Sequence, residues 1–172
     1  MKAIVLDMDG VITDLYNVPH WLTMLENENA APYIVAKPIG DNEKINACLA
    51  LLQGYGYVVE VVSWLCKNSN NKQFDNATRR AKKQWLKKYY PAIDPRNVHI
   101  VKHGTNKWRV SKCKGGILFD DETNNVEQWN KQTSSGRAIQ IEGIKTLLET
   151  LESIAEQELT KREDKQNAVS SI

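Results

Sequence analysis

The chain has 172 residues, of which 41% are hydrophobic and 26% charged, the ordinary balance of a globular protein with one core. Its 23 basic and 21 acidic residues leave a net charge of +2, too small to predict binding to nucleic acid or to a membrane by bulk charge. The three cysteines are widely spaced and form no CxxC motif or Cys/His cluster, which argues against a zinc site. No secretory leader precedes the first apolar run, so we expect a soluble, cytoplasmic protein.

Apolar patterns along the chain alternate between short runs and helical spacing. The short runs predict strands at 2–6, 57–62, 97–101, 116–119 and 138–141. The helical patterns predict helices at 41–55, 77–90, 124–131 and 143–159. Asp41 is a candidate N-cap for the first of these helices, and Pro91 would end the second. Alternating strands and helices predict an α/β fold of three layers, Rossmann-like, with a mostly parallel central sheet.

Three segments fall outside this alternation. Residues 15–40 contain three prolines and mixed polar and aromatic residues, and we expect a small cap-like insertion there, with a short helix near 20–26. Residues 67–76 are polar and predict a loop. Residues 160–172 predict a polar, flexible tail. Residues 1–159, with the 15–40 insertion included, are expected to form a single domain.

Polar side chains follow four of the predicted strands. Asp7 and Asp9 come after the first strand, and Ser63 after the second. The loop 103–107 follows the third strand, and the pair at 120–121 ends the fourth. Ligands of open parallel sheets bind at the carboxyl ends of the strands, so we expect these residues to surround one cleft.

Carboxylates that converge on one cleft repel one another unless a cation lies between them. Asp7, Asp9, Asp120 and Asp121 are therefore predicted metal ligands. Oxygen ligands without a neighbouring His or Cys favour Mg²⁺, which accepts substrate phosphate oxygens as further ligands. A metal, a hydroxyl group and a lysine together indicate phosphoryl transfer.

The DMDGV sequence at 7–11 resembles the first motif of the haloacid dehalogenase-like phosphohydrolases, DxDG(T/V). Ser63 after a hydrophobic strand is similar to the second motif, Lys107 to the third, and the acidic pair after GILF, Asp120-Asp121, to the fourth. The resemblance covers roughly residues 1–145. A single DxDG is a weak signal, whereas four motifs in the right order at strand ends are specific.

This resemblance implies a role for each motif residue. Asp7 would attack phosphorus and form an aspartyl-phosphate, and Asp9 would act as general acid and base. Ser63 and Lys107 would bind the phosphate. Mg²⁺ would be held by Asp7, Asp120 and the backbone carbonyl of Asp9, with Asp121 close to the metal. The implied catalytic set is Asp7, Asp9, Ser63 and Lys107.

Other residues compete for these roles or add to them. Lys82 is an alternative phosphate lysine, but it lies in a basic helix whose charges are expected to face solvent. Lys107 is preferred because it follows the third strand. Trp64 could flank a substrate base or sugar, and Lys67 could contact phosphate, so the expected substrate-binding set is Ser63, Trp64, Lys67 and Lys107.

Within that superfamily the stretches VLDMDGVITD, KQWLKKYYP and ILFDDETNN resemble the 5'(3')-deoxyribonucleotidase-type branch. The resemblance implies a Mg²⁺-dependent phosphatase acting on nucleoside monophosphates, with a reduced cap. An open cleft would also admit a nucleic-acid end or a phosphoprotein, although the net charge does not favour nucleic acid. A non-catalytic phosphate-binding module and a phosphotransferase remain alternatives, and no membrane partner is expected.

Overall fold

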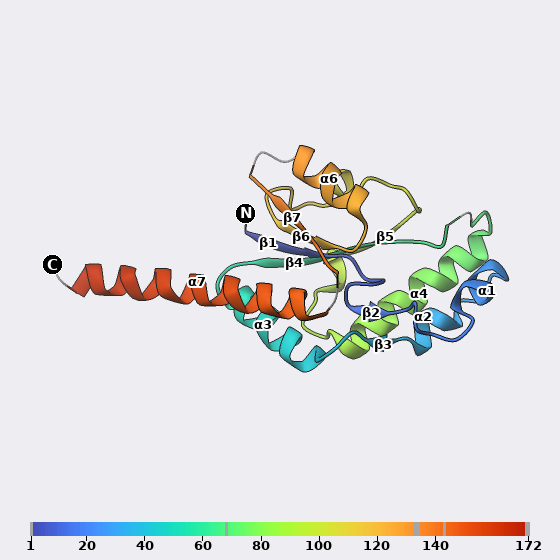
Figure 1. Cartoon of the computed structure of the whole chain (residues 1–172), viewed down its shortest axis with the longest axis horizontal. Coiled ribbons are helices and arrows are strands. Elements are labelled where there is room, and N and C mark those ends of the chain that lie inside the picture. The colour runs from blue at the N-terminus through green and yellow to red at the C-terminus, as the bar shows by residue number, and fades with distance from the viewer. Residues whose placement is uncertain (1, 68, 133–134, 143, 171–172) are drawn as a thin grey trace.

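The computed structural model describes residues 2–67, 69–132, 135–142 and 144–170. Five parallel strands form the central sheet in the order β5-β4-β1-β6-β7, with β1 in the middle (Figure 1). These strands are β1 (Ala3–Leu6), β4 (Val58–Trp64), β5 (Val98–Val101), β6 (Ile117–Asp120) and β7 (Arg137–Gln140). The predicted α/β class with a parallel sheet is confirmed, and each strand lies within two residues of its predicted bounds.

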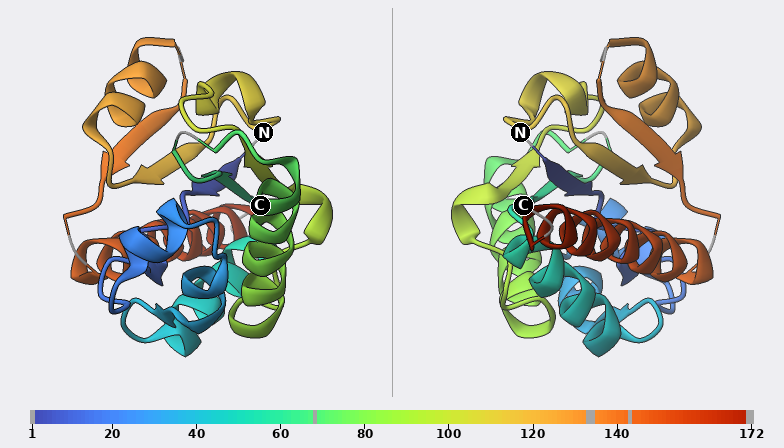
Figure 2. Two further views of the ribbon diagram at one scale, coloured as in Figure 1. Left: turned by 90° about the vertical axis from the view of Figure 1, so that its right-hand side faces the viewer. Right: turned by 90° about the vertical axis from the view of Figure 1, so that its left-hand side faces the viewer.

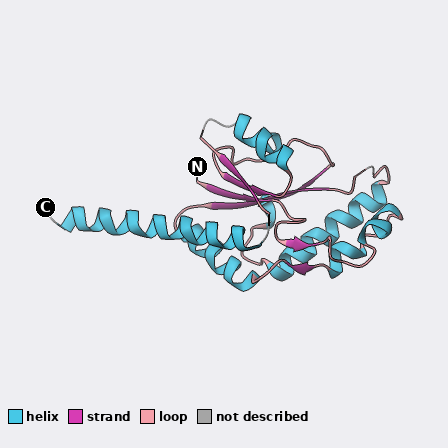
Figure 3. Cartoon of the chain, viewed as in Figure 1, coloured by secondary structure: helices cyan, strands magenta, loops and turns pink. Residues whose placement is uncertain are grey.

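Helices cover both faces of this sheet (Figures 1 and 3). The helices on one face are α3 (Asn42–Gly54), α4 (Lys72–Tyr89) and α7 (Ile144–Ser170). On the other face lie α5 (Lys107–Val110) and α6 (Thr123–Gln132), while the 3₁₀ turn η1 (Pro95–Asn97) leads into β5. Each face of the sheet has its own apolar core, built around Leu49 and Leu151 on the first and around Trp129 on the second. The three-layer architecture therefore follows from strands that are apolar on both faces.

The segment between β1 and α3 forms a small additional lobe at the edge where the strands end (Figure 2). It begins and ends in an antiparallel pair, β2 (Thr13–Asp14) with β3 (Lys37–Pro38), and contains α1 (Trp21–Glu26) and α2 (Ala31–Val35). Its own apolar cluster packs on Phe74 and Ala81 of α4. The expected insertion at 15–40 corresponds to this lobe.

Capping side chains mark the residues at which α3 and α4 begin. The Asp41 carboxylate accepts a hydrogen bond from the Lys44 backbone N–H at 3.1 Å, which confirms the predicted N-cap of α3. The Asn71 side chain accepts from the backbone N–H groups of Gln73 and Phe74 and begins α4 earlier than expected. The predicted loop at 67–76 is therefore wrong over its second half, because Asn71 is a helix cap and the polar residues after it form the first turns of α4.

The expected flexible tail from residue 160 is instead helical as far as the described chain extends, through Ser170. This stretch is rich in good helix formers and contains no glycine or proline. Arg162 also donates to the Gly54 carbonyl and lies 4.4 Å from the Tyr55 ring centre. The C-terminal part of α7 projects from the body of the molecule (Figure 1). Gly143, the predicted first residue of this helix, and residues 171–172 lie outside the described residues.

Among the described helices, none combines the length and the apolar character needed to cross a lipid bilayer.

The lobe is joined to α4 by a buried hydrogen bond from Trp85 Nε1 to the Ala36 carbonyl at 2.7 Å. Trp85→Phe keeps an aromatic ring but leaves that carbonyl without its donor, so we expect a loss of about 1–3 kcal/mol in the free energy of unfolding. Urea denaturation measures this loss. Trp129→Phe is the matched control, because Trp129 is equally buried and its Nε1 has no acceptor among the described residues. Equal losses for the two variants would contradict the anchoring role of Trp85.

Candidate active site

Three carboxylates meet at the carboxyl ends of the two central strands. β1 and β6 are paired with Leu6 beside Phe119, so the next residues, Asp7 and Asp120, come out side by side. Oxygen atoms of Asp7, Asp120 and Asp121 all lie within 4.8 Å of one another. Strand register thus brings together residues more than a hundred positions apart in the sequence.

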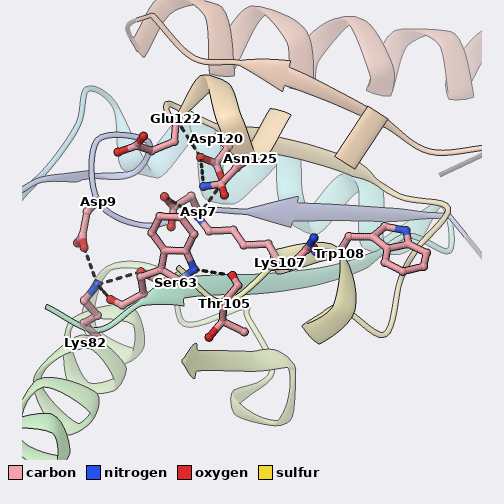
Figure 4. Close-up of polar contacts among 12 residues, drawn as sticks. Asp7, Asp9, Ser63, Lys82, Thr105, Lys107, Trp108, Asp120, Glu122 and Asn125 are labelled. Atoms are coloured by element: carbon pink, nitrogen blue, oxygen red, sulfur yellow. Dashed lines mark hydrogen bonds and ion pairs between the residues drawn. The ribbon is translucent and has the colours of Figure 1, made fainter. Parts of the chain in front are cut away.

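Lys107 neutralises this group from the first residue of α5 (Figure 4). Its Nζ lies 2.8 Å from Asp7 Oδ2 and 2.7 Å from Asp120 Oδ2, and the residue is only 2% exposed. Burial by itself would lower the pKa of Lys107, but the two carboxylates outweigh it and the pKa lies above its ordinary value. Lys107 is therefore a fixed positive charge beside Asp7.

Asp120 is held by its own loop and by α6. Its Oδ1 accepts from Asn125 Nδ2 at 2.9 Å and from the Glu122 backbone N–H at 3.0 Å (Figure 4). Asp121 packs against Gly10, where a side-chain carbon would come 2.2 Å from Asp121 Oδ2 and where φ is +78°. Only glycine satisfies both conditions, which explains the glycine of the DMDG sequence in this chain.

The hydrogen bonding of the carboxylate cluster, and not only its composition, fits a divalent cation. Asp7 Oδ1 and Asp121 Oδ1 are buried and have no hydrogen-bond partner among the described residues. Burial raises the pKa of Asp120, and the neighbouring Asp7 charge raises it further. Burial and the charges of Asp7 and Asp120 raise the pKa of Asp121 to about 7. Acceptor-only oxygens whose charge is disfavoured without a cation suit Mg²⁺.

A second lysine, Lys82, occupies the other side of the site (Figure 4). Its Nζ donates to Asp9 Oδ2 at 2.5 Å, to Ser63 Oγ at 2.9 Å and to the Trp64 carbonyl at 2.7 Å. The residue is fully buried, and the Tyr33 ring of α2 lies 4.6 Å from Nζ. The prediction that Lys82 faces solvent is wrong.

The sequence contained a signal for this burial. Lys82 lies three residues before Trp85 and four before Leu86, so it shares the apolar face of α4 rather than its basic face. The two lysines are not alternatives, because both ammonium groups lie at the site: Lys107 contacts Asp7 and Asp120, and Lys82 contacts Asp9.

Asp9 does not join the three clustered carboxylates, because its side chain extends to Lys82 instead (Figure 4). Its expected metal contact, through the backbone carbonyl, stays a prediction. Burial raises the pKa of Asp9, and Lys82 opposes that shift only in part. Asp9 Oδ1 has no partner among the described residues. A carboxyl group that holds a proton more readily than usual and has a free oxygen is suited to general acid chemistry.

A cavity of about 450 Å³ opens directly onto Asp7, Asp9 and Asp121. Its aromatic lining comes from the small lobe, from β4 and α4, and from the loop before α5: Tyr16, Trp21, Tyr33, Trp64, Phe74 and His103. Leucines of α1, together with Glu26 and Glu28, complete the wall that the lobe contributes. The acids and Trp64 are predictable from the sequence pattern, whereas the aromatic residues of the lobe carry no local signal that places them at the site.

Trp64 and Lys67 both line this cavity, and their contact with substrate stays a prediction. The Trp64 ring centre lies 4.9 Å from Lys107 Nζ and 4.7 Å from the ring centre of His103, and its Nε1 donates to the Thr105 carbonyl. Trp64 is therefore held beside Lys107, at the acidic end of the cavity. Lys67 is exposed at the cavity edge.

Comparison with solved structures finds a chain of the same architecture. D,D-heptose 1,7-bisphosphate phosphatase from Burkholderia thailandensis superposes with a TM-score of 0.51 at 14% identity, over 90% of this chain and 98% of that chain. This likeness supports the fold expected from the resemblance to haloacid dehalogenase-like phosphohydrolases. No protein-family profile matches the chain, and no curated protein sequence is significantly similar to it.

Loss of one clustered carboxylate should weaken metal binding. Asp120→Asn removes a charge from the cluster while keeping its shape, and we expect at least about a tenfold weaker Mg²⁺ affinity by isothermal titration calorimetry. Asp94→Asn, at an exposed loop on the opposite edge of the sheet, is the control for loss of one negative charge. Unchanged affinity in Asp120→Asn would remove this residue from the metal site.

Metal binding should also depend on pH. With its pKa raised to about 7, Asp121 is largely protonated in slightly acidic solution, and Mg²⁺ must displace that proton. Apparent Mg²⁺ affinity should therefore rise from about pH 6 to about pH 8, with proton release seen as a dependence of the binding heat on buffer ionisation enthalpy. Equal affinities and no proton release would mean that Asp121 is ionised before the metal binds.

Proposed function

We propose that this protein is a Mg²⁺-dependent phosphatase that hydrolyses nucleoside monophosphates through an aspartyl-phosphate. The observation that carries the proposal is the position of Asp7. One of its oxygens is held by Lys107 at 2.8 Å, and the other is buried without a partner among the described residues, beside a cavity of ligand size. The phosphatase fold of the structural neighbour is consistent with this chemistry.

Asp7 and Asp9 would have different roles in the two halves of the reaction. A carboxylate oxygen of Asp7 would form the new bond to phosphorus while the ester P–O bond breaks, and Asp9 would protonate the departing oxygen. In the second half, a water molecule would attack phosphorus and displace Asp7, while Asp9 takes a proton from that water. A bound Mg²⁺, held by Asp7, Asp120 and Asp121, would neutralise charge on the phosphoryl oxygens.

The two lysines would have separate electrostatic roles. Lys107 stays beside the nucleophile and would offset the charge of the transferring group. Lys82 donates to Ser63 Oγ, so the Ser63 hydroxyl hydrogen is free to be donated to a phosphate oxygen. Lys82 also holds Asp9, so one buried ammonium group would position both the general acid, Asp9, and the hydroxyl that donates to phosphate, Ser63.

The cavity lining supports a nucleoside as the leaving group. Aromatic faces bind a planar base by stacking, and the cavity volume is within the roughly 300–1,000 Å³ usual for small ligands. Lys67 is the only lysine or arginine among the described lining residues, while Glu26 and Glu28 add negative charge. A second phosphate group, as in a bisphosphate, would meet little positive charge here.

Phosphate release should be measured on nucleoside monophosphates, sugar mono- and bisphosphates and p-nitrophenyl phosphate, with Mg²⁺ and with EDTA. We expect Mg²⁺-dependent release, highest for a nucleoside monophosphate and lowest for the bisphosphate. Asp7→Asn should abolish turnover, and Asp9→Asn should lower kcat at least about a hundredfold, because a general acid contributes that much.

Full activity of Asp7→Asn would refute the mechanism. A different ranking of substrates would refute the nucleotide assignment alone. Folded protein that releases no phosphate from any compound would favour a macromolecular phosphate ester or a binding module.

A further inference from the structure

A buried carboxylate lies outside the active site, in the middle of β4. Glu60 interrupts the valine run of β4 and is 1% exposed, in a strand that lies between β1 and β5. A carboxylate in such a position costs free energy unless it is fully paired, and an apolar residue of the same size would serve stability as well or better. We therefore expect the contacts of Glu60 to serve a role other than stability.

The partners of Glu60 come mainly from one segment. Its Oε2 accepts from Ser111 Oγ at 2.5 Å and its Oε1 from the Lys112 backbone N–H at 3.1 Å. Ser111 Oγ in turn accepts from the Cys113 N–H. His99 Nε2 on β5 lies 3.0 Å from Glu60 Oε1. Both oxygens of the carboxylate thus hold the chain directly after α5.

That segment carries Lys107. α5 has only four residues, too few to be stable by its own hydrogen bonds, and it ends with the Ser111 N–H donating to the Lys107 carbonyl. Its other side is fixed where Trp64 Nε1 donates to the Thr105 carbonyl at 2.8 Å. Glu60 and Trp64 are four residues apart on β4 and so point to the same face. β4 therefore holds the Lys107 segment at both ends.

We propose that Glu60 is a positioning residue for the phosphoryl-transfer site, acting through Ser111 and Lys112 to hold the Lys107 ammonium between Asp7 and Asp120. This inference rests on the proposed phosphatase function, since it gives Glu60 a role in turnover. Lys107 spans two contacts of 2.7 and 2.8 Å, so a small displacement of α5 lengthens both. Misplacement by about 1 Å can cost on the order of a hundredfold in rate.

Glu60 gives a cleaner test than Trp64, because Trp64 lines the cavity and Glu60 is not among the described lining residues. Glu60→Gln keeps the shape but turns an amide N–H toward one of the two donors. Ser111→Ala removes one of those donors and is the milder second variant. We expect both to lower kcat, Glu60→Gln by roughly tenfold to a hundredfold, with KM changed less than about twofold.

The matched control is Glu158→Gln. Glu158 is another buried carboxylate, paired with Lys2, Tyr57 and Lys161 at the opposite edge of the sheet. Its loss should lower the melting temperature without changing kcat. Hydrogen exchange of the Lys107–Val110 amides adds a readout that does not depend on activity, and it should be faster in Glu60→Gln but not in Glu158→Gln.

The outcomes separate the two proposals. A kcat loss in Glu60→Gln and Ser111→Ala, absent from Glu158→Gln, supports the positioning role. A folded Glu60→Gln with wild-type kcat overturns it and leaves the phosphatase intact. If the wild-type protein releases no phosphate from any substrate, the proposed function fails, and hydrogen exchange decides: unchanged protection at Lys107–Val110 also overturns the anchoring by Glu60.

Discussion

Mutual repulsion among buried carboxylates is the constraint on which the site depends. Asp7, Asp120 and Asp121 lie within reach of a single ion, and such a group is stable only if positive charge is placed among its members. Lys107 supplies part of that charge from a segment held on β4, and a cation would supply the rest. The three-layer core is what keeps these groups from moving apart into water.

The second lysine makes the site asymmetric. Lys107 contacts the carboxylate proposed to attack phosphorus, and Lys82 contacts the carboxylate proposed to transfer protons. Because Lys82 also lies under Tyr33 of the small lobe, the lobe and the acid share one buried contact. The lobe is held to α4 by this contact and by Trp85, and it is therefore suited to serve as a fixed wall of the cavity.

Several elements could be predicted from local pattern because their signals are local. The apolar run before Asp7 and the capping aspartate at 41 each depend on neighbouring residues, whereas the glycine after Asp9 also leaves room for the distant Asp121. The start of α4 and the continuation of α7 past residue 160 were missed although their signals are also local, in the capping Asn71 and in helix propensity. Polar composition alone does not distinguish a loop from an exposed helix.

The sequence alone predicts the alternation of strands and helices, the acids and Ser63 at strand ends, and Lys107 in the loop after the third strand. Which carboxylates share a cluster depends on the packed fold, since strand order sets β6 beside β1. The packed fold also establishes that Lys82 reaches Asp9 and Ser63, that the lobe contributes aromatic walls, and that Glu60 reaches the chain after α5. These contacts join residues far apart in the chain, and their free energy depends on burial, which no local pattern specifies.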